Sequence, residues 1–418
     1  MRAALKNPRF RLIWAAGSIS GLGSWLLVVA IPVHVYQLTG SATATGLALA
    51  LEALPPLLIG PWAGGLLDRW NLSRAMWLAD LTAAASVGLI LLADSPDRIW
   101  LIYLAILCEN IASTVFRPAS RALIPSVVDK PDLPGANALN ALSGSVLRLA
   151  APPLGAVLLA GPGLVTVLMV DIASYLTSAL LIARAGREER AARTTKATTN
   201  QRFEVGEGWR AIRRSPSLLG ILVGQTLFLT ANAGLTALLV PFVVNGLGEP
   251  GAAVGYLISG LGAGFLLGAA ASAAAYRRLA IHHLISAAQL ATVGAFFAMV
   301  NAPGLAVAIA AAVLIGMSGS ILLITVETTV QTSSPAAVRG RVGALFFAAD
   351  SLAVIAGGLG APIATHALGL TPALNLISAT GLVAVPVTFR LLQPRSKLRP
   401  RRTKRAPKRS RAGGPRSR

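Results

Sequence analysis

Residues 306–324 read AVAIAAAVLIGMSGSILLI and carry no charged side chain. A helix of about 20 apolar residues crosses the ~30 Å hydrocarbon core of a bilayer. A second apolar block, with Asp80 as its only charged residue, covers Leu78–Ala93. Inside lipid, only helices and closed barrels satisfy their backbone hydrogen bonds, and these runs show little two-residue alternation. The sequence therefore predicts an all-α membrane protein.

The composition of the whole chain supports a membrane location. Of 418 residues, 54% are hydrophobic and 13% are charged, whereas soluble domains carry roughly 25% charged residues. Such a chain could not cover a globule of this size with solvated side chains. The single cysteine, Cys108, excludes an internal disulfide framework.

Apolar blocks of spanning length recur twelve times along the chain. The first six fall near 11–36, 45–67, 75–93, 99–118, 136–160 and 164–183, and the second six near 218–243, 253–276, 281–301, 304–331, 342–366 and 371–392. We therefore expect an N-terminal six-helix bundle (1–183), a cytoplasmic linker (184–216), a C-terminal six-helix bundle (217–392) and a disordered basic cytoplasmic tail (393–418). Within the linker, Gly206–Arg214 is expected to form a short surface helix.

Lysine and arginine residues predict the orientation, because cytoplasmic loops hold the excess of both. With twelve spans, 35 of the 37 basic residues lie at the two ends, in the linker or in loops on one side. The exceptions are Arg98, in a loop on the other side, and Arg148, within a span. We therefore expect both termini in the cytoplasm and a multi-pass location in the cytoplasmic membrane of a bacterium.

The net charge of +21 could also suggest a nucleic-acid partner. However, the segment from Arg390 onward holds thirteen basic residues and no acidic one. Such a tail fits the orientation rule and could also contact anionic lipid. No nucleic-acid partner is expected.

The stretch from Gly64 to Arg74 carries the first family resemblance. Gly64 precedes Asp68-Arg69 between the second and third blocks, and Arg74 follows. This resembles the signature loop of the major facilitator superfamily, although Asn71-Leu72-Ser73 stands where glycine and basic residues are usual. The resemblance implies a charged gate at the cytoplasmic rim.

Two later stretches resemble the drug and siderophore exporter branch of this superfamily. Arg117 and Arg121 lie in Phe116–Arg121, and Arg339 and Arg341 follow at the corresponding inner loop of the second half. These four arginines are expected to belong to the cytoplasmic gate. Two further stretches, Asp171–Tyr175 and Glu207–Trp209, also resemble this branch.

The fifth block contains Arg148-Leu149-Ala150-Ala151-Pro152-Pro153-Leu154-Gly155. It resembles a Gly-Pro-x-x-Gly-Gly element associated with antiporters, with alanine at two glycine positions. The resemblance implies a helix bend at Pro152, Pro153 and Gly155. The alternative is that Pro and Gly are simply frequent in membrane helices.

Ionisable groups at membrane depth are functional candidates by default. The seven candidates are Glu52, Asp80, Glu109, Arg148, Asp171, Glu327 and Asp350. Glu109 shares one helix face with Ser113, Arg117 and Arg121 at four-residue spacing. The resemblance implies that Glu52 and Arg148 flank the same cavity. Glu109 and Glu52 could exchange protons, or could form permanent ion pairs that only join helices, and Arg148 could pair with them or contact substrate charge.

The remaining candidates are given other roles. Asp80 and Asp171 are expected to be structural, and Glu327 to lie near the inner rim. Asp350 stays unassigned. Gln225 could line the cavity or pack between helices.

The function favoured by the resemblance is export of a small amphipathic molecule, such as a drug-like compound, siderophore or secondary metabolite. Exchange for protons, alternating access and a monomer are expected. The alternatives on the same fold are an uptake carrier and a non-transporting protein that acts as a sensor or secretion helper. A membrane enzyme is disfavoured, because Asp94-Ser95-Pro96-Asp97 lacks a second acidic cluster. The chain contains no Gly-Lys pair and therefore no phosphate-binding loop of the Gly-Lys-Ser/Thr type. No cofactor or metal is expected. The adjacent residues His282 and His283 could be tested by metal analysis.

Overall fold

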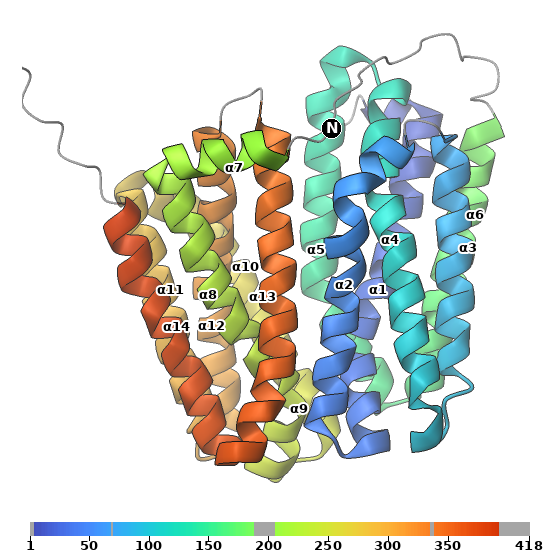
Figure 1. Ribbon diagram of the computed structural model, residues 1–418. Coiled ribbons are helices and arrows are strands. Elements are labelled where there is room, and N and C mark those ends of the chain that lie inside the picture. Colours follow the sequence, from blue (N-terminus) through green and yellow to red (C-terminus); the bar gives the residue numbers. More distant parts are fainter. Residues whose placement is uncertain (1–3, 68–69, 188–204, 335–337, 393–418) are drawn as a thin grey trace, which may run out of the picture.

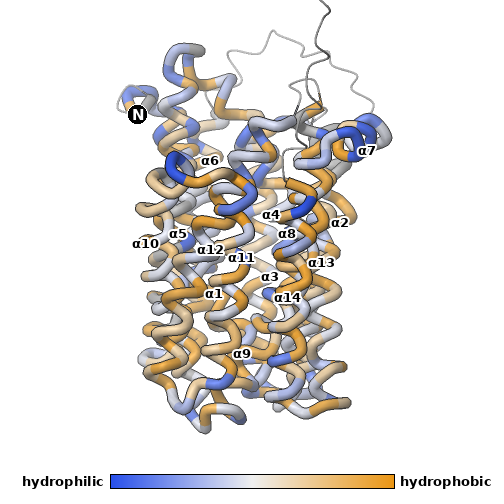
Figure 2. Tube along the Cα trace, turned by 90° about the vertical axis from the view of Figure 1, so that its left-hand side faces the viewer, coloured by the Kyte–Doolittle hydropathy of each residue, from blue (hydrophilic) through white to orange (hydrophobic). Residues whose placement is uncertain are grey.

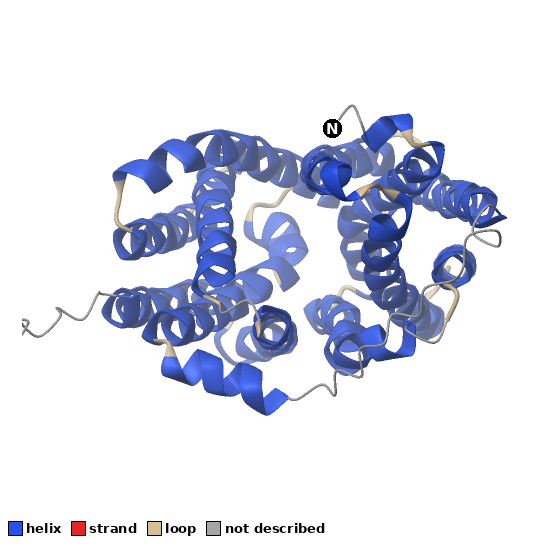
Figure 3. Ribbon diagram, turned by 90° about the horizontal axis from the view of Figure 1, so that it is seen from above, coloured by secondary structure: helices blue, strands red, loops and turns tan. Residues whose placement is uncertain are grey.

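The computed structural model describes residues 4–67, 70–187, 205–334 and 338–392, and all regular structure in these ranges is helical (Figure 1). The first half contains α1 (Pro8–Thr39), α2 (Ala42–Leu67), α3 (Leu72–Ile90), α4 (Ile99–Val127), α5 (Leu133–Ala160) and α6 (Leu164–Arg187). After α7 (Val205–Arg214), the second half contains α8 (Pro216–Ala237), α9 (Leu239–Pro241), α10 (Val254–Arg278), α11 (Ile281–Val300), α12 (Leu305–Ser333), α13 (Arg339–Leu368) and α14 (Leu370–Leu392). Figure 3 shows the two halves side by side. The expected disordered tail, 393–418, lies outside the described residues.

Eleven helices in the described ranges are long and apolar enough to cross a bilayer. The expected twelfth, α3, is not among them. Its length of 19 residues is sufficient, but Arg74 and Asp80 reduce its apolar character. It nevertheless packs lengthwise against α4 and α6 as part of the first bundle.

The expected surface helix is confirmed as α7, which lies across one end of the second half (Figure 1). Its apolar side is anchored by Ile212, which is fully buried beneath it. Trp209 on the same helix is exposed. An amphipathic helix of this kind is typical of a position between a core and solvent or lipid headgroups.

The first turn of α1 and the last turn of α14 lie at the same end of the molecule as α7 (Figure 1). Figure 2 shows hydrophobic residues along most of the height of the bundles and hydrophilic residues gathered at the α7 end. This distribution matches a body that crosses lipid, with polar segments outside it.

The two halves touch each other at the end opposite α7. A side chain at Gly46 of α2 would collide with the backbone of Gly358 in α13, so these helices approach closely there. Asn245 Nδ2 donates a hydrogen bond to Tyr36 Oη over 2.7 Å. Thr43 Oγ1 lies 3.4 Å from His366 Nε2. The molecule is therefore closed between its halves at this end.

Helix α4 extends well beyond its expected end at residue 118 and continues to Val127. It does so through Pro118 and Pro125, although proline lacks the backbone donor that a helix uses. Neighbouring helices make such interruptions tolerable in membrane proteins. Consequently Arg117 and Arg121 lie inside a helix and not in a loop.

Candidate functional site

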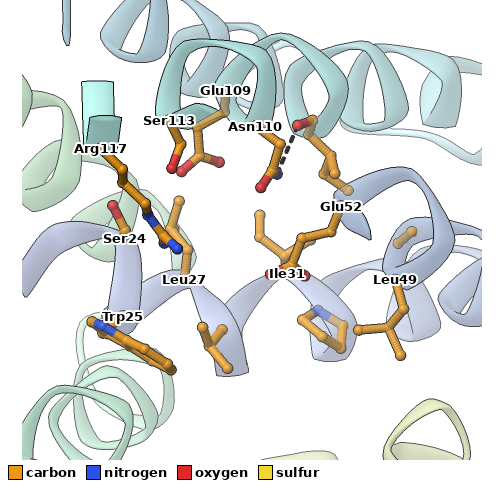
Figure 4. Close-up of a pocket in the computed structure, with 14 residues that line it drawn as sticks. Ser24, Trp25, Leu27, Ile31, Leu49, Glu52, Glu109, Asn110, Ser113 and Arg117 are labelled. Atoms are coloured by element: carbon orange, nitrogen blue, oxygen red, sulfur yellow. Dashed lines mark hydrogen bonds between the residues drawn. The ribbon is translucent and has the colours of Figure 1, made fainter. Parts of the chain in front are cut away.

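A cavity of about 140 Å³ opens in the first half between α1, α2 and α4 (Figure 4). Its walls combine apolar side chains, hydroxyls, two carboxylates and one guanidinium. They are Ser24, Trp25, Leu27, Val28, Ile31 and Pro32 of α1, Ala48, Leu49 and Glu52 of α2, and Ile106, Glu109, Asn110, Ser113 and Arg117 of α4. Such a mixture suits an amphipathic ligand.

The two carboxylates of the cavity lie at similar depth. Glu52 and Glu109 each follow the first residue of their helix by ten positions. At 1.5 Å per residue, each lies about 15 Å from that end of its helix, roughly halfway across a hydrocarbon core of ~30 Å. Both expected acidic groups are therefore brought to one mid-depth cavity.

Glu109 has a specific partner on another helix. Tyr175 of α6 donates a hydrogen bond from its hydroxyl to Glu109 Oε1 over 2.7 Å. The same hydroxyl lies 2.9 Å from Ser24 Oγ of α1. Tyr175 is 5% exposed, so this contact is shielded from solvent. The sequence had marked Tyr175 only as part of a family-like stretch.

Three of the four residues expected on one polar face of α4 lie together in the structure. Glu109, Ser113 and Arg117 line the cavity together (Figure 4). Arg121 is exposed one turn further along and does not belong to the lining. Arg117, which was assigned to the gate, is thus a cation of the cavity wall.

Arg148 of α5 contacts an aromatic ring and not a carboxylate. Its guanidinium carbon lies 5.4 Å from the ring centroid of Trp25, which is itself part of the cavity wall. This is a cation–π geometry. Within the described ranges, no ion pair joins Arg148 to Glu109 or Glu52. Of the two roles left open for Arg148, pairing with these carboxylates is not seen among the described residues, and its side chain is exposed beside Trp25.

The signature stretch between α2 and α3 is only partly described. Gly64 lies in the last turn of α2, whereas Asp68 and Arg69 lie outside the described residues. Asn71, which departs from the family pattern, caps α3: its Oδ1 accepts the backbone N–H of Arg74 over 2.9 Å. Asparagine is among the best residues at this position.

The second-half arginines connect α13 to α7. Arg339 is the first residue of α13. Arg341 forms an ion pair with Glu207 of α7. A side chain at Gly208 would press on Arg341 and Leu345, so α7 seats closely on α13 here. The sequence had noted both segments but not that they meet.

The proline pair of the fifth block lies in an uninterrupted helix, α5. Pro152 is buried there, and the side chain of Pro153 lies outside the described residues. Gly155 has a clear role, because a Cβ at this position would come within 2.5 Å of the carbonyl oxygen of Leu26 in α1. The bend stays a prediction, while the close approach of α5 and α1 is a finding.

The other acidic candidates occupy different surroundings. Asp80 and Asp171 are 2% and 0% exposed. Gln225 Nε2 donates to both carboxylate oxygens of Asp350, over 2.8 and 2.9 Å, and so links α8 to α13. Glu327 is exposed on α12. Gln225 therefore has a packing role.

The side chains considered for a metal or enzyme site contact neighbours along the chain. No group of three or more His, Cys, Asp or Glu side chains in the described ranges could hold a metal ion. The rings of His282 and His283 lie with centroids 4.1 Å apart and are tilted by 38°. Asp94, from the outer acidic turn, pairs with Arg98 over 3.2 Å.

A family model described as a transmembrane secretion effector matches residues 2–409. Among curated proteins, the chain is 25% identical over 383 residues to an uncharacterised MFS-type transporter, YfiS, of Bacillus subtilis, covering 88% of this chain and 90% of YfiS. It is 26% identical over 367 residues to the enterobactin exporter EntS of Escherichia coli O1:K1, covering 85% and 86%. It is 25% identical to macrolide efflux protein A of Streptococcus pyogenes over 232 residues, or 55% and 57% of the two chains.

The fold is shared with a solved transporter. A bacterial homologue of the human lysosomal transporter Spinster, in an inward-facing and unoccupied conformation, superposes with a TM-score of 0.73. Its sequence is 15% identical, and the match covers 92% of this chain and 96% of that one. At this identity the likeness shows the arrangement of helices alone.

Proposed function

This chain belongs to the transmembrane secretion effector family of major facilitator transporters, a group of carriers and not enzymes, and we propose that it exports a small amphipathic molecule across a bacterial cytoplasmic membrane. The observation that carries the proposal is the mid-depth cavity, where Glu109 and Glu52 face Trp25 and several aliphatic side chains. Export is favoured over uptake because EntS and macrolide efflux protein A are named as exporters. Drug-like compounds, siderophores and secondary metabolites are cargoes of suitable chemistry.

We assign the α7 end to the cytoplasm. The basic residues of the chain concentrate in segments at this end, as the positive-inside rule requires, and α3 is assigned as the twelfth span. The halves contact each other at the opposite end. In this assignment the structure is the inward-facing state of an alternating-access cycle. The basic tail would then meet the anionic inner leaflet.

Glu109 is the proposed proton site. When the cavity faces outward, the carboxylate takes up a proton as cargo leaves, forming an O–H bond. When the cavity faces inward, that bond breaks, the proton enters the cytoplasm, and cargo binds. Arg117 in the same wall stays charged throughout and stabilises the carboxylate left behind. The monomer contains all of these groups.

Transport in everted membrane vesicles tests the proposal. The probes are radiolabelled erythromycin and iron-free enterobactin, chosen from the names of the two exporters. We expect an imposed proton gradient to drive uptake of at least one probe into everted vesicles. Vesicles lacking the protein provide the baseline. Movement in the reverse direction would favour the uptake carrier, and no flux of these or related amphipathic compounds would favour the sensor or secretion helper.

A further inference from the structure

A second cavity, of about 130 Å³, lies beside the first and among α1, α3, α4 and α6. The two cavities share four lining residues: Ser24, Trp25, Ser113 and Arg117. Only the second is lined by Asp80 and Tyr175. Because these walls contain several polar groups, the space is large enough and polar enough to hold water.

Asp80 is a buried acid that the proposed transport step does not use. It is 2% exposed, and no hydrogen bond of normal geometry reaches its Oδ2 from the described residues, although the Ser178 hydroxyl of α6 lies nearby. An ionisable group within a membrane span is costly and is usually retained for a function. The Oδ2 oxygen is itself sealed from solvent, but Asp80 is a lining residue, so its carboxyl group adjoins whatever occupies the cavity.

Hydroxyl groups connect this acid's cavity to Glu109. The Tyr175 hydroxyl donates to Glu109 Oε1 over 2.7 Å and lies 2.9 Å from Ser24 Oγ. Both Tyr175 and Ser24 also line the second cavity. A proton on Glu109 is thus one hydroxyl away from the space that Asp80 faces.

We propose that Asp80 is a second proton-binding site, which exchanges protons with Glu109 through the Tyr175 hydroxyl and the cavity beside it. The proposal rests on the proton role of Glu109 in the proposed function. It assigns a task to a carboxyl group for which the sequence indicated only a structural role.

The exchange conserves protons and charge. An O–H bond breaks at the Glu109 carboxyl group and one forms at the Asp80 carboxylate. Tyr175 accepts a proton from Glu109 and releases its own toward the cavity, where water or Ser24 passes it on, so the phenol ends unchanged. The net result is one negative charge on Glu109 in place of one on Asp80.

The helices packed against α3 supply the groups that influence Asp80. They present Glu109 and Arg117 from α4, and Asp171 and Tyr175 from α6. No metal-binding group competes with the proton in the described ranges. The exchange therefore needs only carboxyl groups, hydroxyl groups and water in the cavity.

Asp171 provides a matched control. Like Asp80 it is a buried aspartate on a helix of the first bundle. As in Asp80, its Oδ2 has no hydrogen-bond partner among the described residues. Its Oδ1 accepts a hydrogen bond from Ser174 over 3.3 Å, and Gly23 of α1 closes over it. It lines neither cavity. We expect no exchange with Glu109 by the same route.

Infrared spectroscopy of the full chain, purified and reconstituted in lipid, tests the proposal without any cargo. Asp80→Asn and Asp171→Asn identify the carbonyl band of each protonated aspartic acid as the pH is lowered. Transfer to heavy water then reports hydrogen exchange at each carboxyl group. In Tyr175→Phe, we expect exchange at Asp80 to slow at least about tenfold, since a positioned proton carrier contributes ~10²- to 10⁴-fold. Exchange at Asp171 should stay unchanged.

Ser24→Ala is the second variant, for use if Tyr175→Phe does not fold, and it should slow exchange at Asp80 in the same sense. An Asp80 band that never appears on acidification would overturn the proposal, as would exchange that is equally fast in the wild type and both hydroxyl variants. If efflux occurs but hydroxyl-dependent proton exchange at Asp80 does not, only the second proton site is refuted. If this exchange occurs but no compound is exported, only the proposed function is refuted.

Discussion

Gly155 of α5 lies against Leu26 of α1, and the absence of a side chain on this glycine allows the two helices to approach each other closely. A Cβ on Gly155 would meet the backbone of Leu26, which cannot move without shifting α1. Trp25, the neighbouring residue on α1, forms part of the cavity wall. The spacing of α5 and α1 thus helps to place this wall, as small residues at membrane helix contacts generally do.

Gly155→Ala should destabilise the protein by about 1–3 kcal/mol, because overpacking forces neighbouring atoms apart. The readout is the midpoint of thermal unfolding in detergent. Gly144→Ala on the same helix is the control, since no atom outside its own helix backbone and immediate neighbours lies within 4 Å of a Cβ there. Alanine is the better helix former, so this control should keep or raise the midpoint. Equal shifts for both variants would contradict the packing assignment.

The residues of the site differ in how visible they are in the sequence. Glu109 and Glu52 could be selected because a charged residue inside an apolar run is conspicuous. Tyr175 could not be assigned to Glu109, because the two residues are 66 positions apart and meet only once α4 and α6 are packed. Trp25 was missed for a related reason: an aromatic residue in an apolar helix looks the same whether it faces lipid, core or cavity.

Among the helices, α7 is the one that depends most on its neighbours. It has ten residues, and isolated helices shorter than about 12–15 residues are marginal in water. Its contacts with α13 comprise the Glu207–Arg341 ion pair and the close packing of Gly208 against Arg341 and Leu345. The ion pair therefore contributes to keeping α7 folded on the second half.

Arg341→Gln should loosen α7. We expect faster amide hydrogen exchange in residues 205–214, by a few-fold, because a partly exposed ion pair contributes up to about 1 kcal/mol. Mass spectrometry of peptides covering this segment gives the rates. Arg98→Gln, which breaks the exposed pair with Asp94 at the far end, should leave these peptides unchanged. If both variants leave α7 unaffected, the pair does not hold it.

Most helix boundaries follow from hydrophobic blocks, and the exceptions have physical reasons. The block in α4 ends at Pro118, yet the helix continues because packing compensates for the missing donor. In α3 the apolar block was visible, but Arg74 and Asp80 leave it short of a clear span. The pairing of α7 with α13 joins segments far apart in the chain, which no local pattern can indicate.

At the scale of the whole molecule, the proposed inward-facing state requires a cavity that is closed at one end and open at the other. The halves meet through Gly46 and Gly358 and through Tyr36 and Asn245, all opposite α7. Glu52 is exposed in the cavity wall. An exposed group at mid-depth and a closed far end together fit a cavity open toward the α7 end.

Glu52→Cys, in a Cys108→Ser background, should react with a membrane-impermeant maleimide added to everted vesicles, where the assigned cytoplasmic end faces the medium. Intact cells should show several-fold slower labelling, because the closed end then faces the reagent. Asp97→Cys, at an exposed position in the turn that joins α3 and α4 on the closed side, provides the opposite pattern as a control. Labelling of Glu52→Cys mainly from outside the cell would contradict the assigned orientation.

The central claim is that cargo and protons pass through one cavity and meet at Glu109. Cargo-dependent proton movement, followed with a pH-sensitive dye in everted vesicles, tests it most directly. In the wild type, adding a transported probe should release protons from energised vesicles, and Glu109→Gln should abolish that release while the protein stays folded and inserted. Undiminished cargo-dependent proton movement in Glu109→Gln would contradict the claim.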